Sequence, residues 1–333
     1  MKDILYNQIN PIVRIEESRL LQQEFFEKMI QAESFQECKD LLKSTVYAPY
    51  IEQEDFDVRF EYYLREESAR VFQKIYELAP EKEVVDLYTM RYSYHNLKLL
   101  TKAHYTKQNL DEYWINDGKY SMETMKSAIA NHTSASIGGL MMESIQEVSV
   151  YLEEYKKMRG IDIIYDRYYL KDQRATAEKL GYAEITKEVI AFIDLTNIFT
   201  TLRGIRQHQT ENFMSTVLSS SGSIPKKELL AYVTKDMSQF TVYLQNGPYK
   251  EVAAPLFDEK TQMISPVLID REKDDYLSKL YEPAKTQAFG PLPLLSLLNA
   301  QEIEGKNLQL ILSGKKNHFS RSQIRERMRK VYV

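Results

Sequence analysis

The chain has 333 residues, with 44 basic and 48 acidic side chains and a net charge of −4 at pH 7. This balance argues against a general nucleic-acid-binding protein, which usually carries a strong excess of basic residues. The one cysteine, Cys38, cannot form an intramolecular disulfide, so a disulfide-stabilised secreted fold is excluded. With only 11 glycines and 10 prolines, the chain has few of the breakers that a many-stranded sheet with tight turns would need. The composition therefore predicts an all-α protein.

No segment of the sequence has the pattern of a membrane span. The first residues, Met1–Tyr6, lack the apolar stretch of a signal peptide. The most apolar segment, Phe289–Ala300, contains Pro291 and Pro293 and is shorter than the roughly 20 apolar residues that a spanning helix needs. We expect any association with a membrane to occur through a partner.

The first helices are predicted from their caps and their apolar periodicity. Ser34, followed by Glu37, has the pattern of a capping box that opens a helix running toward Leu42. Two longer helices are expected next, over Asp57–Leu78 and Glu83–Tyr105.

The rest of the chain is predicted to continue as helices. Ser219–Gly222 is the best candidate for a linker, and Ser320 with Gln323 forms a second capping box. An irregular, proline-containing stretch is expected over Gly247–Pro266. The helical segments are predicted over Ser121–Asn131, Met142–Arg159, Ile161–Lys179, Glu184–Gln209, Pro225–Leu244, Asp270–Tyr281, Leu294–Leu312 and Ile324–Val331.

A helical pattern occurs three times along the chain, at intervals of about a third of its length. Its centre is an asparagine within an apolar helix: Asn96, Asn197 and, in a weaker copy, Asn307. A tyrosine-containing element precedes each copy, with Tyr63, Tyr169 and Tyr276 as the corresponding positions. Repetition at a long period indicates one structural unit used three times. The predicted units are residues 1–112, 113–218 and 219–333.

An asparagine in the middle of a helix costs several tenths of a kcal/mol relative to alanine. If it is buried, its amide must also find hydrogen-bonding partners. We therefore interpret Asn96 and Asn197 mainly as ties between their helix and a neighbouring backbone segment. A role in ligand binding is the alternative.

The sequence carries no recognisable catalytic motif. Gly314-Lys315 lacks the upstream glycine of a phosphate-binding loop. The five histidines show no metal-ligand spacing, and one cysteine cannot make a cysteine-rich zinc site. We predict no catalytic, cofactor-binding or metal-ligating residues, and no cofactor.

Two segments are unevenly charged. Acidic residues predominate between Glu33 and Glu61, and basic residues between Lys315 and Lys330. Both could be solvated helix faces, or they could be complementary docking surfaces that orient partners. For the C-terminal helix the first interpretation places Ile324, Met328 and Val331 inward. The second makes a partner interface of Arg321, Arg325, Arg327, Arg329 and Lys330.

Several segments, in this order and spacing, resemble the C subunit of bacterial and archaeal vacuolar-type ATPases, whose eukaryotic counterpart is the d subunit. The resemblance extends from about residue 5 to the end of the chain. The segments that carry it are Val13–Leu21, Ser34–Tyr50, the helices of Asn96 and Asn197, Glu302–Lys316 and Ile324–Met328.

The resemblance implies an all-α fold of three similar helical units around a pseudo-threefold axis, shaped as a funnel. It implies a non-catalytic rotor subunit of the central stalk, one copy per complex and monomeric when isolated. Its partners would be the central shaft subunits and the membrane rotor ring, on the cytoplasmic side of the membrane. The coupling ion, proton or sodium, would be chosen by the ring.

Two other classes of protein remain as alternatives. A free-standing scaffold of helical repeats would normally use shorter repeats, of about 34–47 residues. A helical enzyme would require a concentrated set of titratable groups, which the sequence does not show.

Overall fold

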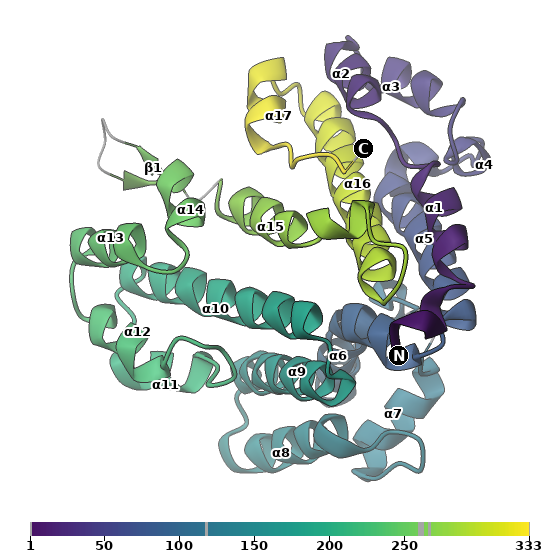
Figure 1. Cartoon of the computed structure of the whole chain (residues 1–333). Helices are drawn as coiled ribbons and strands as arrows, with labels where there is room; N and C mark the ends of the chain where they lie inside the picture. Colours follow the sequence, from purple (N-terminus) through teal and green to yellow (C-terminus); the bar gives the residue numbers. More distant parts are fainter. Residues whose placement is uncertain (1, 117–118, 259–262, 266–267, 333) are drawn as a thin grey trace. The chain divides into compact units, whose positions relative to one another are not determined.

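The computed structural model describes residues 2–116, 119–258, 263–265 and 268–332 (Figure 1). Within them the chain is helical apart from one short antiparallel strand pair, β1 (Phe257–Asp258) with β2 (Met263–Ile264). This confirms the predicted all-α fold class. The strand pair lies in the stretch predicted to be irregular, of which residues 259–262 and 266 are outside the described residues. The outer ends of the predicted units, residues 1 and 333, are outside them too.

The chain packs as two compact units. Unit 1 combines Met1–Val85 with Lys250–Val333, and unit 2 is Asp86–Tyr249. The three predicted units group residues by repetition along the sequence, whereas these two units group them by packing. The threefold division therefore stays a prediction.

Unit 1 contains helices from both ends of the chain. The helix α6 (Lys82–Thr106) begins in it and continues into unit 2. The other helices of unit 1 are η1 (Lys2–Tyr6), α1 (Asn10–Glu17), α2 (Gln23–Gln31), α3 (Phe35–Leu42), α4 (Ala48–Ile51), α5 (Phe56–Leu78), α14 (Lys250–Ala253), η3 (Ala254–Leu256), α15 (Ile269–Leu280), η4 (Glu282–Lys285), α16 (Leu292–Lys316) and α17 (Arg321–Arg327).

The core of unit 1 joins segments that are far apart in sequence. Phe26 and Met29 of α2 belong to the same buried cluster as Leu308 and Ile311 of α16 and Ile324 of α17. The burial of these side chains supplies the main driving force for holding the N-terminal helices against α16.

Unit 2 is continuous in sequence. Its buried cluster includes Tyr94 and Leu97 of α6, together with Ile145, Ile161 and Tyr165. Its further helices are η2 (Asp111–Tyr113), α7 (Met122–Asn131), α8 (Gly139–Tyr155), α9 (Arg159–Leu180), α10 (Ala183–Arg206), α11 (Glu211–Val217), α12 (Lys226–Val233) and α13 (Met237–Asn246).

Ser34 and Ser320 are confirmed as helix caps, but only the box at Ser320 is complete, because the Glu37 carboxylate accepts from the N–H of Glu33 (2.7 Å). The Ser34 hydroxyl accepts a hydrogen bond from the Glu37 N–H (3.1 Å), and Ser320 with Gln323 forms a complete capping box. The predicted helix Pro225–Leu244 is in fact two helices, because Asp236 caps the start of α13.

The last predicted helix, Ile324–Val331, is wrong at both ends. The helix α17 begins at Arg321, directly after its cap Ser320, and ends at Arg327. Met328 already has an extended conformation, with φ −63° and ψ 135°. The chain leaves the helix there because the next residue, Arg329, bonds to another helix through its backbone.

Candidate functional site

The three repeated asparagines make the same pair of hydrogen bonds. In each copy the side-chain amide donates to a backbone carbonyl oxygen and accepts from the N–H of the same residue. Asn96 bonds Ile115 in this way (2.6 and 3.0 Å), and Asn197 bonds Ser219 (2.9 Å for both). Asn307 bonds Arg329 (3.0 Å for both). We call this arrangement the asparagine tether.

The tether satisfies buried groups that would otherwise be costly. The three asparagines are 0–2% exposed. Each amide is paired on both its donor and its acceptor side with one residue's backbone, which removes the penalty of about 1–3 kcal/mol for a buried unpaired polar group. This is the tie between helix and backbone that the sequence predicts. Asn307, in the weakest copy of the sequence pattern, makes it as fully as the other two.

The segment between each asparagine and its backbone partner has the same order of structural elements in all three copies. The long helix ends, one residue takes a left-handed conformation, and a short helix leads to the tethered residue. The left-handed residue stands eleven positions after the asparagine in every copy: Lys107 (φ 60°), His208 (φ 51°) and His318 (φ 56°). The short helices are η2, α11 and α17.

Two glycines make room for the short helix in the second and third copies. Gly204 and Gly314 both stand seven residues after the asparagine of their copy. A Cβ at Gly204 would lie 2.6 Å from the Met214 sulfur of α11, and one at Gly314 would lie 2.9 Å from Cδ1 of Ile324 of α17. These glycines are not among the predicted site residues, although their equal offset was a readable signal.

A carboxylate three residues before the asparagine holds a further segment in two of the copies. Asp194 Oδ1 accepts hydrogen bonds from the N–H groups of Ser223 (2.8 Å) and Ile224 (3.1 Å). Asp194 Oδ2 accepts from the hydroxyls of Ser223 (2.5 Å) and Tyr249 (2.9 Å). Glu304 has the corresponding position in the third copy. The predicted linker at Ser219–Gly222 is non-helical, but Asn197 bonds its first residue and Asp194 bonds Ser223 and Ile224, which directly follow it.

The three tyrosines are half-buried and have different neighbours. Tyr63 stacks on Phe56 with ring centroids 5.9 Å apart and donates to Asp55. Tyr169 packs between the rings of Tyr94 and Phe192. Burial raises the pKa of Tyr276 on α15. Their equivalence as repeat positions stays a prediction.

The basic C-terminal segment is bonded to carboxylates of its own unit. Arg321 pairs with Glu33, and Arg325 lies 2.9 Å from Glu27. Arg329 Nε donates to Asp274 (2.7 Å). Ile324 is buried, and Met328 and Val331 pack against the same core, as the non-docking interpretation expects. Arg327 lies over the Phe319 ring, and the Lys330 N–H donates to Asp275.

The pair of Arg321 with Glu33 joins the two unevenly charged segments inside unit 1, whereas Glu27 and Asp274 lie outside the acidic segment. Lys315 Nζ also donates to the carbonyl oxygen of Ile30 (2.6 Å), and Lys316 donates to that of Asp57 (2.5 Å). In Figure 1, α17 and the end of α16 lie near α2. These contacts assign an intramolecular role to Arg321, Arg325 and Arg329. They do not test the predicted partner interface.

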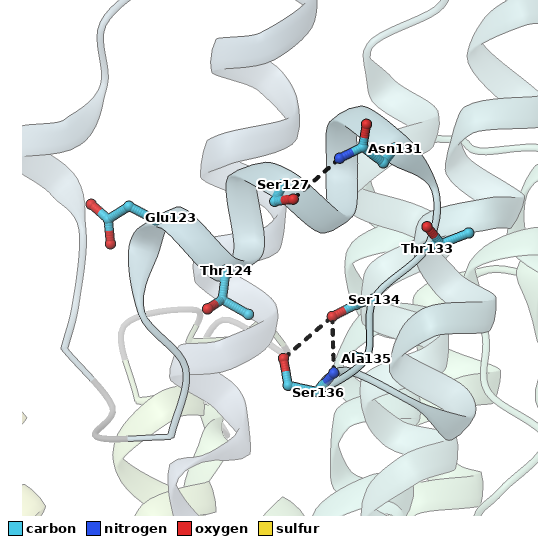
Figure 2. Close-up of a pocket in the computed structure, with 8 residues that line it drawn as sticks. All are labelled: Glu123, Thr124, Ser127, Asn131, Thr133, Ser134, Ala135 and Ser136. Carbon is cyan, nitrogen blue, oxygen red and sulfur yellow. Dashed lines mark hydrogen bonds between the residues drawn. The ribbon is translucent and has the colours of Figure 1, made fainter.

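A polar depression of about 620 Å³ lies beside α7 (Figure 2). Its hydroxyl and amide groups bond mainly to one another. The Ser134 oxygen accepts from the N–H groups of Ser136 (3.2 Å) and Ile137 (3.1 Å), and Asn131 donates to Ser127 (3.1 Å). The depression is open and offers no converging set of groups to a ligand. Its lining residues are Glu123, Thr124, Ser127, Asn131, Thr133, Ser134, Ala135 and Ser136.

Cys38 is buried and donates to the Met29 carbonyl oxygen (3.3 Å). Burial raises its pKa to about 11, so it is an inert thiol. Among the described residues no group of three or more His, Cys, Asp or Glu side chains could hold a metal ion. No helix in the described part of the chain is long and apolar enough to cross a membrane.

The fold and its tethers define an all-helical protein in which a helix–short helix–tether element occurs three times. A model of the family described as "ATP synthase (C/AC39) subunit" matches residues 9–327. The C subunit of the V-type sodium ATPase of Enterococcus hirae is 50% identical over 98% of this chain and 99% of its own length. The chain therefore belongs to the C subunit family of V-type and A-type ATPases, a non-catalytic subunit of these complexes.

More distant relatives agree over nearly the same length. The C subunit of the A-type ATP synthase of Methanocaldococcus jannaschii is 24% identical over 96% of this chain and 85% of its own length. The C subunit of the A-type ATP synthase of Methanothermobacter thermautotrophicus is 22% identical over 95% of this chain and 86% of its own length.

Proposed function

We propose that the chain is the rotor subunit that links the central shaft of a V-type ATPase to its membrane ring and transmits torque between them. The observation that supports this most strongly is the 50% identity to the C subunit of a V-type ATPase over almost the full length of both chains. In this role the protein lies on the cytoplasmic side of the membrane, one copy per complex. It supports ATP-coupled transport of sodium or protons, and the relative's name favours sodium.

We propose, with this role, that three similar helical units surround a pseudo-threefold axis as a funnel. The three tethers at Asn96, Asn197 and Asn307 support this arrangement, because one local design recurs at regular intervals. A part that transmits torque must resist twisting. Tethers that bind each short helix to a long one, within densely packed helices, contribute that stiffness.

The proposal is tested by purifying the tagged chain from detergent-solubilised host membranes and identifying the bound chains by mass spectrometry. We expect the shaft subunits and the membrane ring to be recovered together. Recovery of neither, from membranes shown to contain the ATPase, would reject the rotor role and favour a free-standing helical scaffold.

The predicted partner interface is best tested at the two of its five basic residues for which no ion pair is found in the described part of the chain. These are Arg327 and Lys330, and we expect Arg327→Glu with Lys330→Glu to reduce recovery of the partners. Lys157→Glu with Lys227→Glu is the matched control, because both lysines are exposed and lie outside the C-terminal segment. Equal recovery from both double variants at physiological salt would remove the C-terminal segment from the interface.

A further inference from the structure

The carboxyl group of Glu304 is buried in unit 1 between segments from opposite ends of the chain. Its Oε2 accepts the Leu21 N–H (2.6 Å), and its Oε1 accepts the Tyr47 hydroxyl (2.9 Å). Glu304 is 4% exposed and Tyr47 is fully buried. The two bonds attach the loop before α2 and the loop after α3 to α16. We call these three groups the Glu304 latch.

Asp194 in unit 2 has the position in the repeat that Glu304 has in unit 1, and its hydrogen-bonding capacity is fully used. Asp194 accepts four hydrogen bonds, including two from consecutive N–H groups at the entrance to α12. Glu304 accepts one N–H bond, at the entrance to α2, and one tyrosine O–H bond. An ionised carboxylate has about four acceptor sites. The latch therefore leaves an ionised Glu304, which is only 4% exposed, half satisfied.

The charged groups around the latch do not compensate that charge. The neighbouring charge that acts on Glu304 is the Glu67 carboxylate of α5, which repels it. Glu67 is bonded to Arg70 (2.6 Å) and accepts the Tyr50 hydroxyl (3.2 Å). On α1, Glu16 pairs with Lys74 (2.5 Å) and Arg19, and it lies 3.7 Å from the Arg70 nitrogen that also pairs with Glu67. The nearby cations are thus paired with other carboxylates.

Burial, the largest cause, raises the pKa of Glu304 from 4.5 to about 7. The bonds from Leu21 and Tyr47 lower it, and Glu67 raises it further. A carboxyl group with this pKa changes its protonation state near neutral pH, whereas an exposed glutamate would be ionised throughout that range.

We propose that the Glu304 latch is a proton-controlled fastening of the N-terminal segment to α16, which is closed when Glu304 is neutral and opens more often when it is ionised. The geometry supports this proposal, because the carboxyl group is buried, its two donors are neutral, no cation among the described residues pairs with it, and the Glu67 carboxylate repels its charge. The proposal depends on unit 1 alone and holds whatever partners the protein has.

Opening of the latch should increase as the pH rises, because protonation and closure are linked. The closed latch binds the proton more tightly than an opened, hydrated one, so proton binding favours closure. The closed state is fully favoured below a pH of about 4.5, and the preference is lost as the pH rises to about 7. The difference between these pKa values limits the change in the opening equilibrium to about 300-fold.

Hydrogen–deuterium exchange of the full-length protein, followed by mass spectrometry from pH 5 to 8, tests the proposal. Exchange of the peptide covering residues 19–31 is divided by its intrinsic chemical rate at each pH. We expect its opening to increase at least tenfold over this range in the wild type, and to become independent of pH in Glu304→Gln. The glutamine keeps an oxygen that can accept from Leu21 or Tyr47, but it cannot ionise.

Two further variants make the outcome decisive. Asp194→Asn alters the equivalent position in unit 2 and should leave the pH dependence of residues 19–31 unchanged. Tyr47→Phe removes a donor to the ionised form and should move the midpoint of the pH dependence upward. An increase below tenfold in the wild type overturns the proposal, as does a tenfold increase that persists in Glu304→Gln.

Discussion

Asn197 in unit 2 and Asn307 in unit 1 tether their short helices with the same two hydrogen bonds. The carboxylates three residues before them, however, bind segments at very different distances along the chain. In unit 2 the following segment turns back at once, because Asp194 binds Ser223 and Ile224, 29 and 30 residues away in sequence. In unit 1 the equivalent carboxylate, Glu304, binds Leu21, 283 residues away. A local closure can form as soon as its own segment is folded, whereas the closure in unit 1 needs both ends of the chain.

The tethers also differ in burial, which ranks their expected contribution to stability. Both hydrogen bonds of Asn197 are buried, whereas those of Asn307 are partly exposed to solvent. We expect Asn197→Ala to lower the free energy of unfolding by about 3 kcal/mol and Asn307→Ala by about 2 kcal/mol, because a backbone N–H and a carbonyl both lose their partners. Urea denaturation followed by circular dichroism measures both values.

Asn131→Ala is the control for this pair, because Asn131 is exposed and bonds only to a nearby serine. We expect it to change the stability by less than about 0.5 kcal/mol. Equal losses for Asn131→Ala and Asn197→Ala would show that the tether does not stabilise the fold.

The closure in unit 2 brings a glycine, Gly222, against the Asp194 carboxylate. A Cβ at Gly222 would lie 2.1 Å from Oδ1 of Asp194, an atom fixed by two N–H bonds. We expect Gly222→Ala to destabilise the protein by about 2 kcal/mol, because the loop must move off the carboxylate. The measurement is again denaturation in urea.

A double-mutant cycle separates this contact from a general effect of the loop. In an Asp194→Ala background the added methyl group meets no carboxylate, so Gly222→Ala should cost much less there. If its cost is the same in both backgrounds, the close approach to Asp194 is not its cause.

Substitution of the glycines that contact the short helices, Gly204 in unit 2 and Gly314 in unit 1, should lower stability by smaller and unequal amounts. Gly314→Ala pushes against Ile324, a branched and fully buried side chain, and should cost about 1–2 kcal/mol. Gly204→Ala pushes against Met214, whose flexible thioether can move aside, so its cost should be lower. Thermal unfolding of the two variants ranks them, and a larger loss at Gly204 would contradict this account.

Apart from the Asn131 control, the smallest effect is expected at the ion pair between Arg325 and Glu27, which are 46% and 38% exposed. Arg325→Ala should change stability by less than about 1 kcal/mol, since solvent screens such pairs. Its effect should decline further at high salt. A loss that is large and independent of salt would mean that packing, and not charge, is the contribution of this side chain.

Much of the candidate site could be predicted from the sequence because it depends on local patterns. The caps at Ser34 and Ser320 follow from residue types three positions apart. A polar residue in an apolar helix stripe indicates that Asn96 and Asn197 need partners. The identity of those partners, Ile115 and Ser219, was not predictable, because no local pattern marks a backbone group that another helix will bond.

The sequence by itself determined the all-α class, most helices, the recurrence of the asparagine and the family resemblance. The class and the helices depend on composition and on periodicity among neighbouring residues, and the recurrence and the resemblance depend on the order and spacing of segments along the chain. Only the tertiary structure decided that the basic C-terminal residues pair with Glu27, Glu33 and Asp274, and that Glu304 is buried against Leu21 and Tyr47. Most of those contacts join residues hundreds of positions apart, and their energies depend on burial, which arises only when both ends of the chain pack into one core.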